Sequence, residues 1–199
     1  MALPTYDKSK RRKNFEHLPK GAYVVKILGA KEETGNYGQQ VAIYFDIAEG
    51  EHRDFYNKQY ESNTSEDKVW PYDAVFYLTV PTDGCADWIW TKWNTFFGDL
   101  EDSNNGFIFD GDLKKLKGKI VGGKFHNKQK AKNGNVYDHT VMKWSCVADD
   151  VRNGKAGKLP NDVLANSSAP ATGGTYKNIA DELDGFVNLP DGSAEELPF

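Results

Sequence analysis

The chain lacks the marks of a secreted or membrane protein. Its 199 residues include only two cysteines, Cys85 and Cys146, which stand 61 positions apart. Neither belongs to a Cys-x-x-Cys pair, and the four histidines form no ligand spacing with them, so we expect no disulfide framework, metal site or cofactor. No apolar run reaches the about 18 residues of a transmembrane helix, and no apolar signal-peptide core follows the basic start. The sequence therefore predicts a cytoplasmic protein that does not contact a membrane.

Acidic residues are absent from 113–132, although the whole chain has a net charge of −4. That stretch holds eight lysines, at positions 114, 115, 117, 119, 124, 128, 130 and 132. Like charges so close together repel one another, which favours a polyanionic partner. Charge alone is also typical of a lysine-rich, solvated hairpin loop, so both interpretations stay open at this point.

Charge is divided unevenly along the chain. The first 160 residues have 24 Lys and Arg against 22 Asp and Glu, whereas 161–199 have one against seven. A second basic run, at 8–13, precedes the first predicted strand. Such a run is typical of an arm that contacts phosphate and equally of a solubilising end.

Apolar and polar residues alternate in several segments, which predicts strands. At 41–47 every second residue is apolar, the pattern of a strand with one face on a core. We expect 22–30 to be its antiparallel partner, with the Gly-Asn-Tyr-Gly sequence at 35–38 as the turn. A third extended stretch is expected from Arg53 onwards, and it resumes at 73–80 after a polar loop.

The remaining pattern predicts one helix and a second hairpin. Trp90, Trp93 and Phe97 recur at helical spacing, so we expect them to pack on the core. Asp87 is the predicted N-cap, and the Ser-Asn-Asn-Gly cluster at 103–106 ends the helix. Segments 117–126 and 136–147 are then expected to form two strands joined across a lysine-rich loop.

About five strands with one late helix predict an all-β fold, and the OB-fold, a five-stranded Greek-key barrel, fits best. An immunoglobulin-like sandwich is the alternative, which the tryptophan-rich helix and the low strand count disfavour. We expect a basic N-terminal arm at 1–17, the OB-fold domain at 18–151, a linker at 152–180 and a flexible acidic tail at 181–199.

Aromatic residues are interleaved with the lysines, as a binding site for unpaired nucleic acid requires. Lysines contact phosphates, and each ring that stacks on an exposed base contributes roughly 1–3 kcal/mol. Duplex DNA hides those base faces. For Trp70 and Tyr72 the sequence is equally compatible with burial and exposure. The predicted single-stranded-DNA interface comprises Lys58, Tyr60, Trp70, Tyr72, Lys124, Phe125, Lys128, Lys130, Lys132, Tyr137, Lys143 and Trp144.

Catalytic motifs are scarce, so we expect a protein that is not an enzyme. Asp46, Asp54, Asp110 and Asp112 supply carboxylates of the type that two-metal nucleases use, but their spacing gives that interpretation no support. No Walker-type phosphate-binding sequence is present.

The last five residues, Glu195-Glu196-Leu197-Pro198-Phe199, place an aromatic ring and a terminal carboxylate beside two acids. This chemistry suits a pocket rimmed by Lys or Arg on another protein. The segment resembles the acidic tip, ending in Pro-Phe, of bacterial single-stranded-DNA-binding proteins. It lacks the longer aspartate run of the cellular proteins.

The body of the chain resembles the single-strand-binding proteins encoded by phages and mobile elements of Gram-positive bacteria. The resemblance rests on Leu18-Pro19-Lys20-Gly21, the segment 43–50 and Leu116-Lys117-Gly118-Lys119. It implies an OB-fold core that binds single-stranded DNA without sequence preference during replication and recombination. It also implies that the tip recruits replication and recombination proteins, in the host cytoplasm if a phage encodes the chain.

Two other functions fit the same features. One is an adaptor that bridges replication or recombination proteins without holding DNA, and the other is a strand-annealing protein. The sequence also leaves open whether the chain forms a homo-oligomer.

Overall fold

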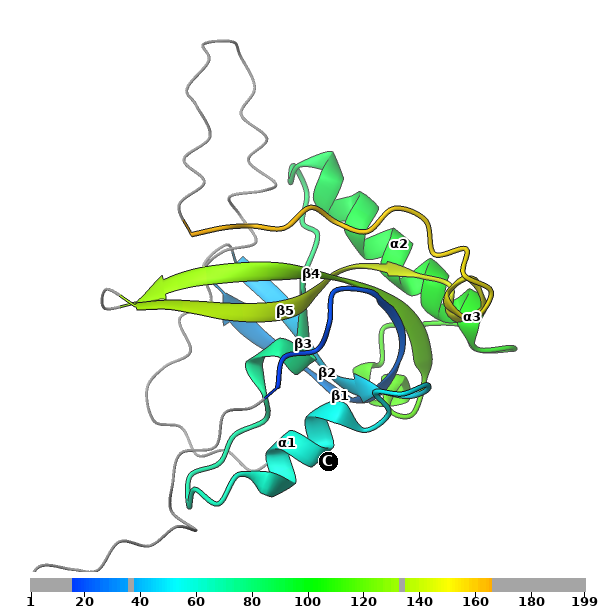
Figure 1. The fold of residues 1–199 in the computed structure, drawn as a ribbon. Helices are drawn as coiled ribbons and strands as arrows, with labels where there is room; N and C mark the ends of the chain where they lie inside the picture. The colour runs from blue at the N-terminus through cyan, green and yellow to red at the C-terminus, as the bar shows by residue number, and fades with distance from the viewer. Residues whose placement is uncertain (1–15, 36–37, 133–134, 166–199) are drawn as a thin grey trace, which may run out of the picture.

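A single antiparallel sheet of five strands forms the body of the molecule in the computed structural model, which describes residues 16–35, 38–132 and 135–165. Figure 1 shows this sheet strongly curved, with α1 and α2 on opposite sides of it. The strand order is β3-β2-β1-β4-β5. The strands are β1 (Ala22–Gly35), β2 (Gly38–Ile47), β3 (Val75–Thr79), β4 (Ile120–Lys132) and β5 (Asn135–Cys146). The mostly-β fold with five strands is therefore confirmed.

Both predicted hairpins are confirmed, and both are longer than expected. β1 pairs with β2 as far as Gly35 opposite Gly38. β4 pairs with β5 as far as Lys132 opposite Asn135. Figure 1 shows the β4–β5 hairpin reaching well beyond the rest of the sheet. The turn residues 36–37 and 133–134 lie outside the described residues.

The core lies on the concave side of the sheet, where the alternating apolar residues of the strands meet. Phe45 of β2 contacts both Phe125 of β4 and Tyr56, with ring centroids 5.8 and 5.9 Å apart. Phe96 and Leu100 of α2 (Asp87–Ser103) close the core from the other side, and both are buried. The alternation of the sequence thus defines which face of each strand is buried.

The segment after Arg53 is a helix, so the prediction of an extended stretch there was wrong. α1 (Phe55–Ser62) begins after Asp54, whose side chain makes no capping hydrogen bond. Asp46 of β2 replaces the cap: its carboxylate accepts hydrogen bonds from the backbone N–H groups of Tyr56 and Asn57, both at 2.9 Å. Because this cap comes from a distant part of the chain, the local sequence does not reveal the helix.

The helix predicted near 87–106 is confirmed as α2, with two differences. Ala86 occupies the cap position and Asp87 lies in the first turn, where a carboxylate interacts favourably with the helix dipole. Phe97 is buried as expected, but Trp90 is 44% exposed. The expected burial of the whole Trp90, Trp93 and Phe97 stripe was therefore wrong at its first member.

The two edge strands of the sheet, β3 and β5, are tied together by side chains. The short 3-10 turn η2 (Tyr72–Ala74) leads into β3, and its Asp73 lies 2.7 Å from His139 Nδ1 of β5. The backbone N–H of Thr140 also donates to Asp73, at 3.4 Å. On α2, Lys92 donates to the carbonyl of Tyr77 on β3 at 3.3 Å. Asp73 thus links the turn that precedes β3 to β5, and Lys92 links α2 to β3.

The chain after β5 returns along the outside of β4. A second 3-10 turn, η3 (Leu113–Leu116), precedes β4, and α3 (Ala148–Arg152) follows β5. Val163 then pairs with β4 in parallel: its N–H donates to Asn127 at 3.0 Å, and its carbonyl accepts from Gln129 at 2.8 Å. Residues 152–165, the first part of the predicted linker, are thus part of the folded body.

Other predicted segments lie outside the described residues. They are most of the basic arm at 1–17, the rest of the linker and the acidic tail at 181–199, with its tip. Within the described ranges, no helix is long and apolar enough to cross a membrane.

Candidate nucleic-acid interface

Two tyrosines lie on the outer face of the β1–β2–β3 part of the sheet. The register places Lys31 opposite Ala42 and Ala42 opposite Tyr77. Tyr44 is two residues from Ala42 on the same strand, so it lies on the same face of the sheet. Tyr44 and Tyr77 are both half-buried and pack against the edge of the apolar core. Lys31 Nζ is 5.9 Å from the centre of the Tyr44 ring. We call Tyr44, Tyr77 and Tyr72 the tyrosine row.

The hydroxyl of Tyr77 lies in a partly buried environment. Burial raises the pKa of the Tyr77 hydroxyl well above its ordinary value, and nearby Glu33, Tyr44 and Tyr72 raise it further. Tyr77 is therefore an uncharged ring at neutral pH. Three rings from β2, β3 and η2 thus form one surface without an anionic phenolate.

The β4–β5 hairpin adds cations and another ring to this surface. Lys128 pairs with His139, and Lys130 pairs with Tyr137. Paired residues, and residues two apart on one strand, share a face, so all four side chains lie on one face of the hairpin. Tyr137 is 43% exposed. We call these four residues the hairpin face.

Tyr72 joins the hairpin face to the tyrosine row. Lys130 Nζ lies 3.9 Å from the centre of the Tyr72 ring, within the range of a cation–π contact. The ring of His139 meets Tyr72 edge-on at a centroid distance of 5.5 Å. Asp73, the next residue, holds His139 at 2.7 Å. Tyr72 is therefore fixed in orientation by partners from both β4 and β5.

Lys128 and Lys130 lie close enough for their positive charges to repel each other. Burial lowers the pKa of Lys130, the neighbouring charge of Lys128 lowers it further, and Asp73 partly offsets both effects. Lys128 itself is only 8% exposed. A phosphate group beside Lys130 would favour the charged form of that lysine.

Trp144 marks the seam where β5 approaches β3. Its side chain is 41% exposed. Lys92 of α2 and the neighbouring Lys143 each place Nζ 6.0 Å from the indole. Lys92 also lies over the Phe76 ring of β3, at 4.9 Å. Trp144 therefore has two lysines beside its ring. One of them, Lys92, belongs to α2, whose residues were predicted to pack on the core and not to join the interface.

Two of the predicted interface rings are in the core, so their assignment was wrong. Phe125 is fully buried, between Phe45 and Tyr23. Trp70 is 7% exposed, and its indole N–H donates to the carbonyl of Ala74 at 3.4 Å. Phe125 stands at a position of β4 whose side chain faces the core. Trp70 packs against Tyr60 of α1. Neither presents a free face to a base.

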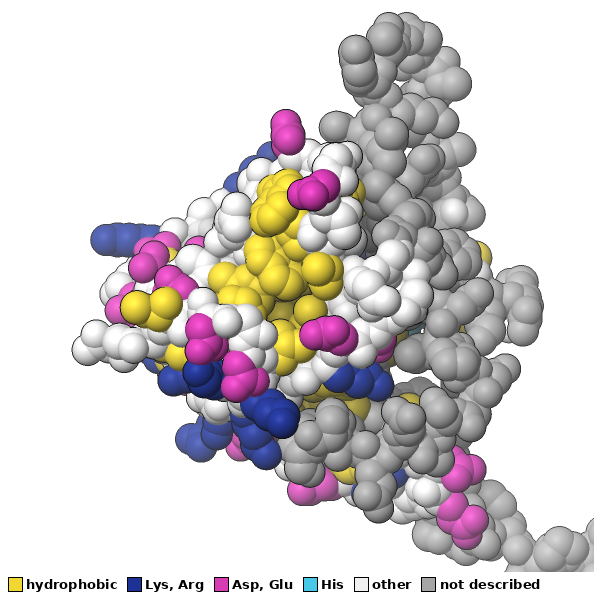
Figure 2. Space-filling view, turned by 180° about the vertical axis from the view of Figure 1, so that it is seen from behind, with side chains coloured by type: hydrophobic (Ala, Val, Ile, Leu, Met, Phe, Trp, Pro, Cys, Tyr) yellow, Lys and Arg dark blue, Asp and Glu magenta, His cyan; other side chains and the backbone are white. Residues whose placement is uncertain are grey.

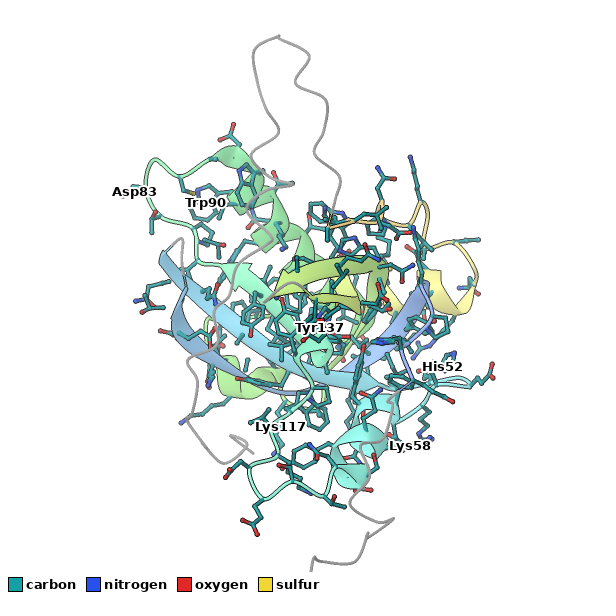
Figure 3. All side chains as sticks on the ribbon, turned by 60° about the vertical axis from the view of Figure 1, so that its left-hand side comes forward. His52, Lys58, Asp83, Trp90, Lys117 and Tyr137 are labelled. Carbon is teal, nitrogen blue, oxygen red and sulfur yellow. The ribbon has the colours of Figure 1, made fainter. Side chains whose placement is uncertain are left out.

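Two other predicted residues, the exposed Lys58 and the half-buried Tyr60, lie elsewhere. Lys58 is on α1 and donates to the carbonyl of Arg53 at 2.7 Å. Tyr60, also on α1, packs on Trp70, with Lys68 Nζ 4.5 Å from its ring centre. Figure 3 shows Lys58 on α1, well separated from Tyr137 on the hairpin. The structure does not bring these α1 residues together with the hairpin face.

The lysine-rich stretch 113–132 is divided between two places. Its first half belongs to η3 and the segment before β4, where Lys117 lies far from Tyr137 in Figure 3. Lys124 pairs with Trp144 on β5 and acts electrostatically on Asp99 of α2. Lys128 and Lys130 alone of the described lysine side chains in this stretch belong to the hairpin face. The side chain of Lys132, at the end of β4, lies outside the described residues.

Sequence reasoning missed Tyr44, Tyr77 and His139 as members of the surface. A signal was present for Tyr44, because it stands at an outward position between the apolar residues of β2. For Tyr77 no comparable signal exists, since β3 is short and its outward residues are not distinguished by charge. The role of His139 depends on Asp73, which is 66 residues away in the chain.

Seen from behind, apolar side chains form a strip with acidic side chains along its borders and Lys or Arg side chains gathered at its lower end (Figure 2). The described part of the chain holds no cluster of three or more His, Cys, Asp or Glu side chains suited to a metal ion.

No protein-family model matches the chain, and no curated protein matches it.

Proposed function

We propose that the protein binds single-stranded DNA across the tyrosine row and the hairpin face. One observation carries the proposal: rings from three separate elements share a surface with lysines placed directly against them. The Lys130–Tyr72 contact at 3.9 Å is the closest of these pairs. Stacking on rings and neutralisation of phosphates are the two interactions that sequence-tolerant binding of unpaired strands uses.

The order of the strands supports an OB-fold as the scaffold. In that fold the face of strands 2 and 3 and the loops between strands 1–2 and 4–5 hold oligonucleotides. Here Tyr44 and Tyr77 lie on β2 and β3, and the hairpin face lies on β4–β5. The side-chain ties between β3 and β5 correspond to the closure of such a barrel, and α2 stands between β3 and β4 in the chain.

Unpaired strands suit this surface better than a duplex does. The Tyr77 ring is half-buried, so a base must leave its own stack to lie on it. A duplex would present phosphates to Lys128 and Lys130 but no base face to the row. The resemblance of the body to phage and mobile-element single-strand-binding proteins agrees with this choice.

The acidic tip at Glu195–Phe199 supplies the second half of the proposal. We assign it to recruiting replication and recombination proteins, from its aromatic end and its charge. The adaptor function differs in requiring no DNA contact, and the annealing function in requiring accelerated pairing of complementary strands. The contacts of Lys130 with Tyr72 and of Lys31 with Tyr44 favour direct DNA binding over the adaptor function.

Titration of the full chain with fluorescent oligo(dT) and with a duplex of equal length tests the proposal. We expect oligo(dT) to bind much more tightly, with log K falling linearly against log salt at a slope of about −0.7 per phosphate neutralised. No binding to either would overturn the proposal and leave the adaptor, and equal affinity for the duplex would overturn the assignment to unpaired strands.

A further inference from the structure

An acid–amide pair lies at the end of the tyrosine row farthest from the hairpin face. Glu33 of β1 pairs with Gln40 of β2, which in turn pairs with Thr79 of β3. These three cross-strand partners lie directly beside another set of partners, Lys31, Ala42 and Tyr77, on the same outer face of the sheet. Glu33 is therefore two strands away from Tyr77, and Gln40, the diagonal neighbour of Tyr77, lies between them.

The geometry of the pair is fixed. Gln40 Nε2 donates to Glu33 Oε1 at 2.6 Å. Gln40 is 9% exposed, and its amide lies over Gly35, where an added Cβ would come within 2.4 Å of Gln40 Oε1. Gly35 thus leaves room for the amide, and the amide holds the carboxylate in one orientation.

A carboxylate is unexpected on a surface that attracts phosphates. Glu33 is half-buried, and its charge acts on the Tyr77 hydroxyl strongly enough to raise the pKa of that group. A phosphate placed near Glu33 would be repelled, whereas a base amino group would find an oriented acceptor. Cytosine presents such a donor at N4, and thymine presents a carbonyl oxygen at the same position.

Resting on the proposed function, we propose that Glu33, oriented by Gln40, accepts a hydrogen bond from the exocyclic amino group of a base stacked on Tyr77. The chain then prefers cytosine-bearing to thymine-bearing single strands, even though most of the surface is tolerant of sequence. One such hydrogen bond predicts an affinity ratio of oligo(dC) to oligo(dT) of about three- to ten-fold.

The test compares oligo(dC) and oligo(dT) of equal length at neutral pH, by anisotropy, on the full chain and on matched variants. Glu33→Gln should bring the ratio close to one while raising affinity for oligo(dT) slightly. Glu32→Gln is the control, because it removes the same charge from the neighbouring position on the opposite face of β1. The ratio should be unchanged in that variant.

A second variant separates contact from charge and protects against misfolding. Glu33→Asp keeps the charge but withdraws the carboxylate by one methylene, so the ratio should again fall toward one. A ratio near one in the unmodified chain, or a ratio that Glu32→Gln lowers as much as Glu33→Gln, would overturn the inference. Failure of the unmodified chain to bind either oligonucleotide would overturn the proposed function itself.

Discussion

The two long hairpins of the sheet are alike in topology and different in chemistry. β4–β5 carries Lys128, Lys130, Tyr137 and His139 on one face. β1–β2 carries Lys31 beside an acid, an amide and a ring on the outer half of its outer face. One hairpin is therefore suited to phosphate, which every nucleotide has, and the other to base edges, which differ between nucleotides. The comparison separates affinity from discrimination within one surface.

The roots of the two hairpins also differ from their ends. Near the core, both strands bury large apolar residues, such as Phe45 on β2 and Phe125 on β4. Toward the end of the β4–β5 hairpin the strands have left the core, and residues such as Lys130 and Tyr137 are available to a ligand. A residue's distance from the core along a strand thus matters as much as its type.

The largest expected effect is a loss of stability when Phe125, where the β4–β5 hairpin leaves the core, is truncated. Phe125→Ala removes a fully buried ring that contacts Phe45 and Tyr23, so the free energy of unfolding should fall by about 3–5 kcal/mol. Urea unfolding measures this change. At temperatures where the variant is folded, oligo(dT) affinity should equal that of the unmodified chain. A specific loss of binding by a fully folded, undestabilised variant would return Phe125 to the interface.

The tyrosine row should show the next largest effect. Tyr77→Leu removes a stacking ring and keeps apolar bulk, so binding of oligo(dT) should weaken by roughly 1–3 kcal/mol. Isothermal titration measures the loss. Tyr60→Leu is the matched control, because Tyr60 packs on Trp70 beside α1, away from the row. An equal loss in both variants would contradict the division between the row and α1.

The smallest effect concerns the pH dependence that Lys130 contributes. Burial and the neighbouring Lys128 lower the pKa of Lys130, so its positive charge is lost at lower pH than that of an ordinary lysine. Affinity for oligo(dT) should therefore decline as pH rises toward that lowered pKa. In Lys130→Arg the guanidinium stays charged, and the decline should shift to higher pH.

Binding measured from about pH 7 to about pH 10 checks this prediction. Lys58→Arg on α1 provides the comparison and should leave the profile of the unmodified chain intact. Identical profiles in all three proteins would show that Lys130 does not contact the strand.

Much of the fold could be predicted because periodicity is a local property. The alternation at 41–47 and the helical spacing of Trp93 and Phe97 were enough to place β2 and α2. α1 could not be predicted, since its cap is Asp46, in a different strand. The residues from Arg53 onwards look extended in the sequence because the carboxylate that caps the helix, Asp46, lies on β2 and not next to the helix.

The site was only partly predictable for the same reason. Lys130, Tyr72 and Tyr137 were identified from their types, and register then placed them together. Phe125 could not be separated from them, because a bulge between Lys124 and Phe125 shifts which residues of β4 face inward. Register and bulges depend on pairing across the sheet, which no single segment encodes.

Photo-crosslinking tests the central claim most directly. Oligo(dT) containing 5-iodouracil, bound to the full chain and irradiated, should crosslink to Tyr44, Tyr72, Tyr77 or Tyr137, as peptide mass spectrometry would identify. These four rings lie on β2, η2, β3 and β5. Crosslinks confined to Trp88, Trp90 or Trp93 of α2 would place the strand on a different surface and contradict the account.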